Sequence, residues 1–153
     1  MPHIHIVTEI AASVERCFDL ARDIDFHTES LARTGEKAIA GRTSGLIELG
    51  ETVTWQGRHF GVQQRFTSKI TSFERPTYFR DEMVAGACRS FAHDHRCESA
   101  NGCTTMIDEV WFRSPYGLLG RVVDGLLLTR YMRGLLATRA DTIKRSAESF
   151  ENA

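Results

Sequence analysis

Two histidines separated by one residue carry the clearest chemistry in this 153-residue sequence. In a strand, alternate side chains share a face, so His93 and His95 would lie side by side, in one row with Phe91 and Cys97. The aromatic neighbour indicates that this row faces the interior. Imidazoles there need hydrogen-bonding partners, because an unpaired buried polar group costs about 1–3 kcal/mol.

The turn that follows predicts such a partner. Asn101-Gly102 is typical of a tight hairpin, and the strand after it carries Asp108. A two-residue loop would place Asp108 opposite His95, and a four-residue loop would place it opposite His93. Either even-length loop therefore brings a carboxylate against one histidine, whereas an odd loop or a bulge would not.

Three interpretations of this histidine–aspartate group stay open. It is a structural network that stabilises the sheet, or it is a polar anchor for a ligand oxygen or for proton transfer. The third is a metal site made by His93, His95 and Cys97, but the sequence supplies no secure further ligand. We therefore predict no metal site and no cofactor. If the protein is an enzyme, His93, His95 and Asp108 are the candidate catalytic residues.

Two more polar residues, Gln64 and Asp81, interrupt alternating apolar rows and are predicted to face the same interior. The remaining histidines are predicted to be surface or turn residues without a role: His3, His5, His27 and His59. The sequence contains no Gly-x-Ser-x-Gly elbow, no phosphate-binding glycine loop and no His-Glu-x-x-His motif. None of the four cysteines forms a Cys-x-x-Cys pair, which excludes a zinc ribbon or a thioredoxin-type motif.

The first elements along the chain are a strand and two short helices. Residues 3–10 alternate in the two-residue period of a half-buried strand. Ser13 is a good helix N-cap, and apolar residues at helical spacing predict a helix to about Arg22. A second short helix is predicted over residues 26–32.

The middle and end of the chain have different periods. From Glu36 to Arg113, alternating apolar residues and regular turn signals predict an antiparallel meander of about six strands. Ser114-Pro115 then signals a helix start, and an apolar stripe continues to about Ser149. Glycines in its first third predict a short helix followed by a long one. The sheet and the long helix each have one apolar face, so each should cover the other, and a curved sheet around one helix tends to leave a cavity.

This order of elements resembles the START-like helix-grip superfamily, which includes polyketide cyclases, aromatases, pollen-allergen-type proteins and lipid-transfer domains. The matching pieces span nearly the whole chain: Ala12–Leu20, Val53–Gly57, Phe79–Met83, Phe91–His95, Gly102–Asp108 and Pro115–Gly117. The chain departs from the pattern at Cys97 and Cys103. The resemblance implies an α+β helix-grip fold, with a curved antiparallel sheet of six to seven strands around a long C-terminal helix. It also implies a deep pocket for a hydrophobic or amphipathic small molecule, without fixing one activity.

Composition limits the alternatives. The length fits one domain, here residues 1–153, and a net charge of −1 gives no electrostatic footprint for nucleic acid. No apolar stretch is long enough to span a membrane, and the first residues lack the features of a secretory signal, so we expect a cytoplasmic location. The sequence leaves the oligomeric state undetermined.

We therefore predict a protein that binds a small hydrophobic or aromatic molecule, lipid-like or polyketide-like. One alternative is a polyketide cyclase, aromatase or dehydratase with a His–Asp pair as general acid or base. Another is a protein-interaction module without a ligand. The predicted ligand-binding residues are Phe60, Val62, Gln64, Phe66, Phe79, Asp81, Phe91, His93, His95, Met106, Asp108, Val110, Leu128, Met132 and Leu135.

Overall fold

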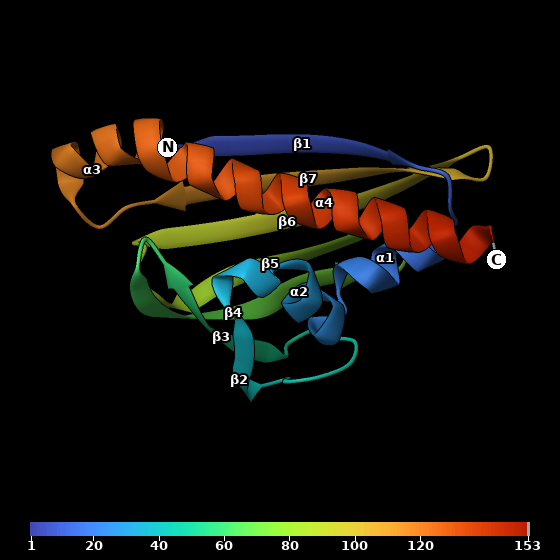
Figure 1. Ribbon diagram of the computed structural model, residues 1–153, viewed down its shortest axis with the longest axis horizontal. Helices are drawn as coiled ribbons and strands as arrows, with labels where there is room; N and C mark the ends of the chain where they lie inside the picture. The colour runs from blue at the N-terminus through green and yellow to red at the C-terminus, as the bar shows by residue number, and fades with distance from the viewer. Residues whose placement is uncertain (153) are drawn as a thin grey trace.

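Seven strands form one antiparallel sheet in the order β1-β7-β6-β5-β4-β3-β2 (Figure 1). This computed structural model describes residues 1–152, without the side chains of residues 124 and 151. Position 153, the last of the predicted domain, lies outside the described residues. The strands are β1 (His3–Ile10), β2 (Lys37–Gly41), β3 (Thr52–His59), β4 (Val62–Glu74), β5 (Tyr78–Ala85), β6 (Ser90–Ala100) and β7 (Cys103–Arg113). The predicted meander of six strands after the first strand is confirmed.

The helices also follow the sequence signals. They are α1 (Val14–Ala21), α2 (Ile24–Ser30), the short 3₁₀ turn η1 (Ala32–Thr34), α3 (Gly117–Val123), the π-helical segment η2 (Asp124–Leu128) and α4 (Thr129–Glu151). The Ser13 hydroxyl caps α1 by accepting from the Arg16 amide at 3.3 Å. The predicted break in the long helical region is the π-helical segment.

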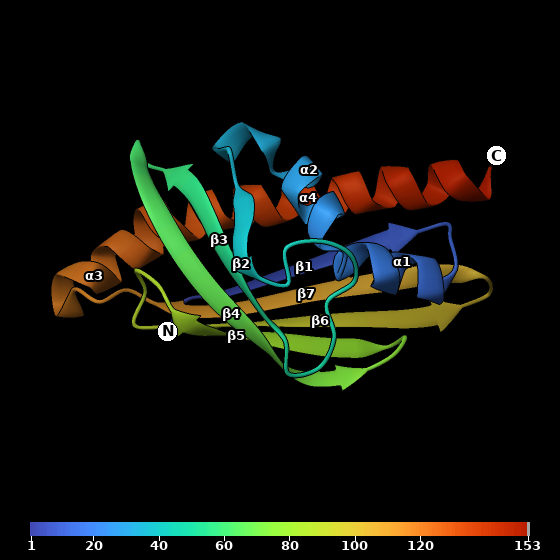
Figure 2. The ribbon, with the colours of Figure 1, turned by 90° about the horizontal axis from the view of Figure 1, so that it is seen from below.

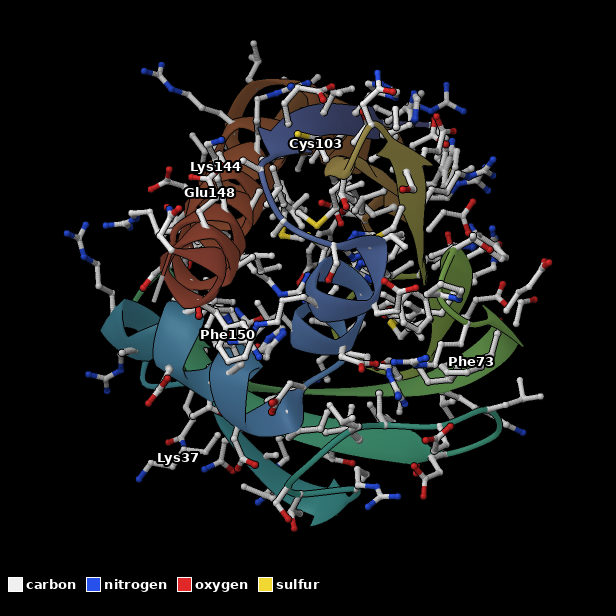
Figure 3. All side chains as sticks on the ribbon, turned by 90° about the vertical axis from the view of Figure 1, so that its right-hand side faces the viewer. Lys37, Phe73, Cys103, Lys144, Glu148 and Phe150 are labelled. Carbon is white, nitrogen blue, oxygen red and sulfur yellow. The ribbon has the colours of Figure 1, made fainter. Side chains whose placement is uncertain are left out.

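The sheet curves around the helices. In the end-on view, the strands run as an arc from β1 and β7 to β3 and β2, and α1 and α4 lie inside it (Figure 3). Two side chains labelled there hold α4 to the chain around the end of β1. Lys144 donates to the Glu9 carbonyl at 2.5 Å, and the Glu148 carboxylate accepts from the Ala11 amide at 3.0 Å. This is the α+β helix-grip architecture predicted from the order of elements.

One end of the space inside the arc is filled by apolar side chains. Phe18 of α1 contacts Phe73 and Phe79 edge-on, with ring centroids 5.5 and 5.4 Å apart. Ile143 and Ala147 of α4 are completely buried in the same cluster. The C-terminal half of α4 therefore closes this end of the fold.

The apolar stripe at the other end departs from the prediction. We expected the whole stripe to pack on the sheet, but its first third is exposed to solvent: Leu119, Val122, Val123, Leu126 and Leu127. Figures 1 and 2 show the reason, because α3 extends past the ends of the neighbouring strands. Among the helices of residues 1–152, none is both long and apolar enough to cross a bilayer.

Candidate functional site

A cavity of about 240 Å³ lies between the sheet and the N-terminal half of α4. Its lining comes from α2, from strands β3 to β6, from the loop before β6 and from α4, and most of the side chains are apolar. The aromatic members are Trp55, Phe60, Phe66, Phe79, Phe91 and Tyr131. The cavity lies between the sheet and the long helix, as the sequence predicted, and the cluster around Phe18 takes up only the later residues of α4: Ala140, Ile143 and Ala147.

Most of the predicted ligand-binding residues line this cavity: Phe60, Gln64, Phe66, Phe79, Asp81, Phe91, His93, His95, Leu128, Met132 and Leu135. The other four lie elsewhere. Val62 follows the β3–β4 hairpin and is mostly exposed, because the strand runs beyond the cavity at that point. Met106 and Val110 are packed into the two apolar clusters of the core. Asp108 is buried behind the histidines rather than in the lining.

The β6–β7 hairpin places the aspartate as predicted for a two-residue loop. Asn101 and Gly102 have φ angles of 52° and 77°, and Ala100 pairs with Cys103 across them. Positive φ at both turn residues matches the right-handed twist of the strands, which explains the Asn-Gly sequence. The register then sets His95 directly opposite Asp108.

Asp108 contacts both histidines with a single oxygen. Its Oδ1 lies 2.9 Å from His93 Nε2 and 3.1 Å from His95 Nδ1. A carboxylate can only accept, so Nε2 carries the proton of His93, and its lone pair is on Nδ1. Both side chains and Asp108 are almost completely buried.

Asp81 completes the group from the neighbouring strand. Its Oδ1 lies 3.1 Å from His95 Nε2 and 3.9 Å from His93 Nδ1. The two imidazoles, with centroids 3.6 Å apart, therefore lie between two carboxylates, Asp108 on the core side and Asp81 on the cavity side. Phe79 stacks on the other face of His95 at 4.0 Å. We call Asp81, His93, His95 and Asp108 the histidine–aspartate group.

The surroundings of the two histidines shift their pKa values in opposite directions. Burial lowers the pKa of His93, the charge of His95 lowers it further, and the contacts with Asp108 and Asp81 do not compensate. Burial also opposes protonation of His95, but its contacts with Asp108 and Asp81 outweigh that penalty, so its pKa is raised. Burial alone would raise the pKa of Asp108, yet the hydrogen bonds with the histidines hold it far below its usual range. The same balance, with His95 as the partner, lowers the pKa of Asp81.

Cys97 does not join this chemistry. Its side chain is packed in the core, and burial raises the pKa of the thiol to about 12. A protonated thiol is a poor nucleophile, and Cys97 is not among the residues whose ligand atoms gather with those of His93 and His95. The metal interpretation that used Cys97 as a ligand is therefore unsupported, and the carboxylate of Asp81 occupies the position beside the histidines.

A second polar group on the opposite wall was missed by the sequence analysis. His27 stacks on Trp55 with centroids 4.1 Å apart, and its Nε2 lies 3.8 Å from Glu36 Oε1. His27 and His59, predicted to be surface or turn residues without a role, both line the cavity, although His59 does lie beside the β3–β4 turn. Nothing in the local pattern indicates this, since α2 and the end of β3 are brought together only by the curvature of the sheet.

Two residues of α4 add polar atoms to the cavity. The Tyr131 hydroxyl lies 2.7 Å from His59 Nδ1 at the cavity wall. The buried guanidinium of Arg139 donates to the Ala21 carbonyl and so links α4 to the end of α1. The sequence pattern did not single out Arg139, and only the packing of α4 shows that both residues line the cavity.

Comparison with solved structures gives the fold a place among known proteins. The protein TTHA0849 of Thermus thermophilus superimposes with a TM-score of 0.72 at 15% identity, covering 95% of this chain and 99% of that one. Norcoclaurine synthase from Thalictrum flavum gives 0.67 at 14% identity, covering 94% and 84%. The major latex-like protein 151 of Panax ginseng gives 0.68 at 10% identity, covering 95% and 97%.

Sequence comparisons add nothing to this relationship, because no family profile and no curated protein matches the chain. Identities of 10–15% support a shared fold and do not transfer an activity. Together with the curved sheet, the long α4 and the cavity between them, the superpositions confirm the α+β helix-grip fold.

Proposed function

We propose that the protein binds a small, mostly apolar organic molecule in the cavity between the sheet and α4. The observation that carries the proposal is the cavity itself, about 240 Å³ of space walled by aromatic and aliphatic side chains. Binding would be driven by burial of apolar surface, worth about 25 cal/mol per Å². A lipid-like or polyketide-like ligand fits this lining.

Polar groups on two walls would set the orientation of the ligand. The histidine–aspartate group presents Asp81, His93 and His95 to the cavity, and the other wall presents His27 and His59. Pockets of this kind gain affinity from their apolar surface and specificity from a few polar contacts. The ligand would therefore carry at least one oxygen or nitrogen that pairs with these groups.

Native mass spectrometry of protein purified from its own host tests the proposal directly. We expect a co-purified small molecule that is released by denaturation. Titration with the fluorescent apolar probe 8-anilinonaphthalene-1-sulfonate gives a second measurement. Leu135→Trp, which puts a large ring into the cavity, should weaken probe binding at least about tenfold because volume is lost.

Leu126→Trp is the matched control, because it adds the same ring to an exposed position outside the cavity lining. Binding should stay within about twofold of the wild type in this control. Equal affinities for both tryptophan variants, together with no co-purified molecule, would contradict binding in the cavity.

Contact between His93 and Asp108 favours one second candidate, an enzyme of the polyketide cyclase or dehydratase type. With its Nε2 proton held by Asp108, His93 would offer the Nδ1 lone pair to remove a proton from a carbon between two carbonyl groups of the ligand. The kinetic test is His93→Ala. An enzyme would lose turnover with ligand affinity unchanged within a few fold, whereas a carrier would show a change in affinity only.

A further inference from the structure

We propose that Asp81, His93 and His95 form a binding site for a divalent transition-metal ion of the zinc type in the wall of the cavity. One ligand atom from each of the three residues lies within 4.8 Å of the other two. Two imidazole nitrogens and one carboxylate oxygen are a donor set that suits zinc and other first-row divalent ions. The sequence offered Cys97 as the third ligand, but the fold supplies Asp81 from β5 instead.

On each imidazole one ring nitrogen faces Asp108 and the other faces Asp81. Each histidine has one ring nitrogen within 3.1 Å of Asp108 Oδ1, Nε2 for His93 and Nδ1 for His95. The other nitrogen of each ring, Nδ1 of His93 and Nε2 of His95, is on the side of Asp81. Asp108 forms a hydrogen bond with His93 Nε2 and lies close to His95 Nδ1, so a carboxylate stands behind the two imidazoles, as in the usual second layer of a histidine metal site.

The distances between the ligand atoms need little adjustment. Metal–ligand bonds of about 2.0–2.2 Å place neighbouring ligand atoms roughly 3–3.5 Å apart. Asp81 Oδ1 already lies 3.1 Å from His95 Nε2, and it lies 3.9 Å from His93 Nδ1. A small rotation of the Asp81 side chain, which is the least buried of the three, would close the longer gap.

The protein would supply three ligands from one side and leave the remaining positions open to the cavity. All three residues line the cavity, whereas Asp108 does not. This open position resembles the arrangement of catalytic rather than structural zinc sites. The class of the organic ligand rests on the proposed function. That ligand would be an apolar molecule with a carboxylate, a phenolate or a β-diketone, which coordinates the metal through oxygen.

A second cluster of two histidines and one carboxylate provides a built-in control. His3, His5 and Glu109 also place three ligand atoms within 4.8 Å of one another, but on the outer surface. We therefore suggest all measurements in a His3→Ala/His5→Ala background, which removes that cluster and leaves the cavity unchanged. The metal is measured without an organic ligand, so failure of metal binding and failure of ligand binding are distinguishable.

The experiment is titration of this chelator-treated background protein with Co²⁺ and with Zn²⁺. We expect one Co²⁺ per chain, visible d–d absorption, displacement by Zn²⁺, and paramagnetic shifts of backbone amide signals centred on β5 and β6. Asp81→Asn should weaken Zn²⁺ binding at least about 100-fold, and Asp108→Asn, which acts through the histidines, about 10- to 100-fold.

Paramagnetic shifts locate the metal without a mutation in the site, so the test does not depend on a variant that fails to fold. His93→Gln provides a second ligand variant with the same expected loss. The proposal is overturned if the background protein binds no Co²⁺ at micromolar concentrations or if the shifts centre elsewhere. It is also overturned if a folded Asp81→Asn protein binds Zn²⁺ as tightly as the background.

Discussion

The chain contains two His-x-His pairs, one on β1 and one on β6, and they have nearly the same local partners. His3 and His5 share a face of β1 and lie 3.4 and 3.3 Å from Glu109 on the neighbouring strand β7. His93 and His95 share a face of β6 and contact a carboxylate on the same neighbour. The first pair is exposed on the convex side, and the second is buried on the concave side.

This comparison shows what spacing does and what burial adds. Spacing alone brings two imidazoles and one carboxylate together in both places. On the surface, water competes for every polar atom, so such contacts contribute little. On the concave side a second carboxylate, Asp81, is within reach, and the loss of solvent couples the protonation of the four groups.

The largest expected difference is in stability. Asp108→Ala should lower the free energy of unfolding by roughly 3–5 kcal/mol, because it leaves buried histidines without their carboxylate. Glu109→Ala, one residue along β7 and on the opposite face, should cost less than about 1 kcal/mol. Urea unfolding of both variants measures the two losses in unfolding free energy. Similar losses would remove the distinction between the two histidine pairs.

Next in size is the pH dependence within the buried pair. The pKa of His95 is raised, so its contribution to stability is fully present below its ordinary pKa of 6.5 and is lost as the pH rises through the folded value. The pKa of His93 is lowered, so its contribution is present above 6.5 and is lost as the pH falls below that value. Each slope is at most about 1.4 kcal/mol per pH unit.

Unfolding free energies measured from pH 5 to 9 should therefore show opposite slopes for the two contributions. Subtracting the curve of His95→Asn from the wild type isolates the first, and His93→Asn isolates the second. Direct titration of the ring signals by NMR provides an independent check. Two histidines that titrate with the same midpoint would show that Asp108 and Asp81 do not distinguish them.

The smallest expected effect belongs to the outer pair. Replacing His3 and His5 together by alanine should change the unfolding free energy by less than about 0.5 kcal/mol, because both are exposed on the edge strand β1. The stacking of His3 on Trp111, at 4.9 Å, is the one contact that would make the loss larger. A loss near that of Asp108→Ala would mean that exposure does not separate the two pairs.

Much of the fold was predictable, because local patterns carried it. Ser13 predicted the start of α1, and the Asn101-Gly102 turn reduced the residue opposite Asp108 to two possibilities. The structure has the first, His95, and the same carboxylate also reaches His93. The apolar stripe predicted the long helix. It misled at Leu119 and Leu126, which are exposed, because periodicity shows which residues share a face and not whether anything covers that face.

The candidate site was predicted only in part for a related reason. Asp81 was recognised as a polar residue in an apolar row, but its contact with His95 depends on how β5 lies beside β6. Nothing in the sequence around His27 predicted that its side chain lines the cavity. Its ring meets Trp55 because α2 and β3, far apart in the sequence, are brought to the same wall by the curvature of the sheet.

The sequence by itself determined the elements, their order and the sharing of one strand face by His93 and His95, because these properties follow from the geometry of a few neighbouring residues. The tertiary structure decided which of the two His-x-His pairs is buried and where the second carboxylate comes from. It also decided where a cavity remains between α4 and the sheet. These are consequences of long-range packing, in which the curvature of the whole sheet sets distances that no local pattern encodes.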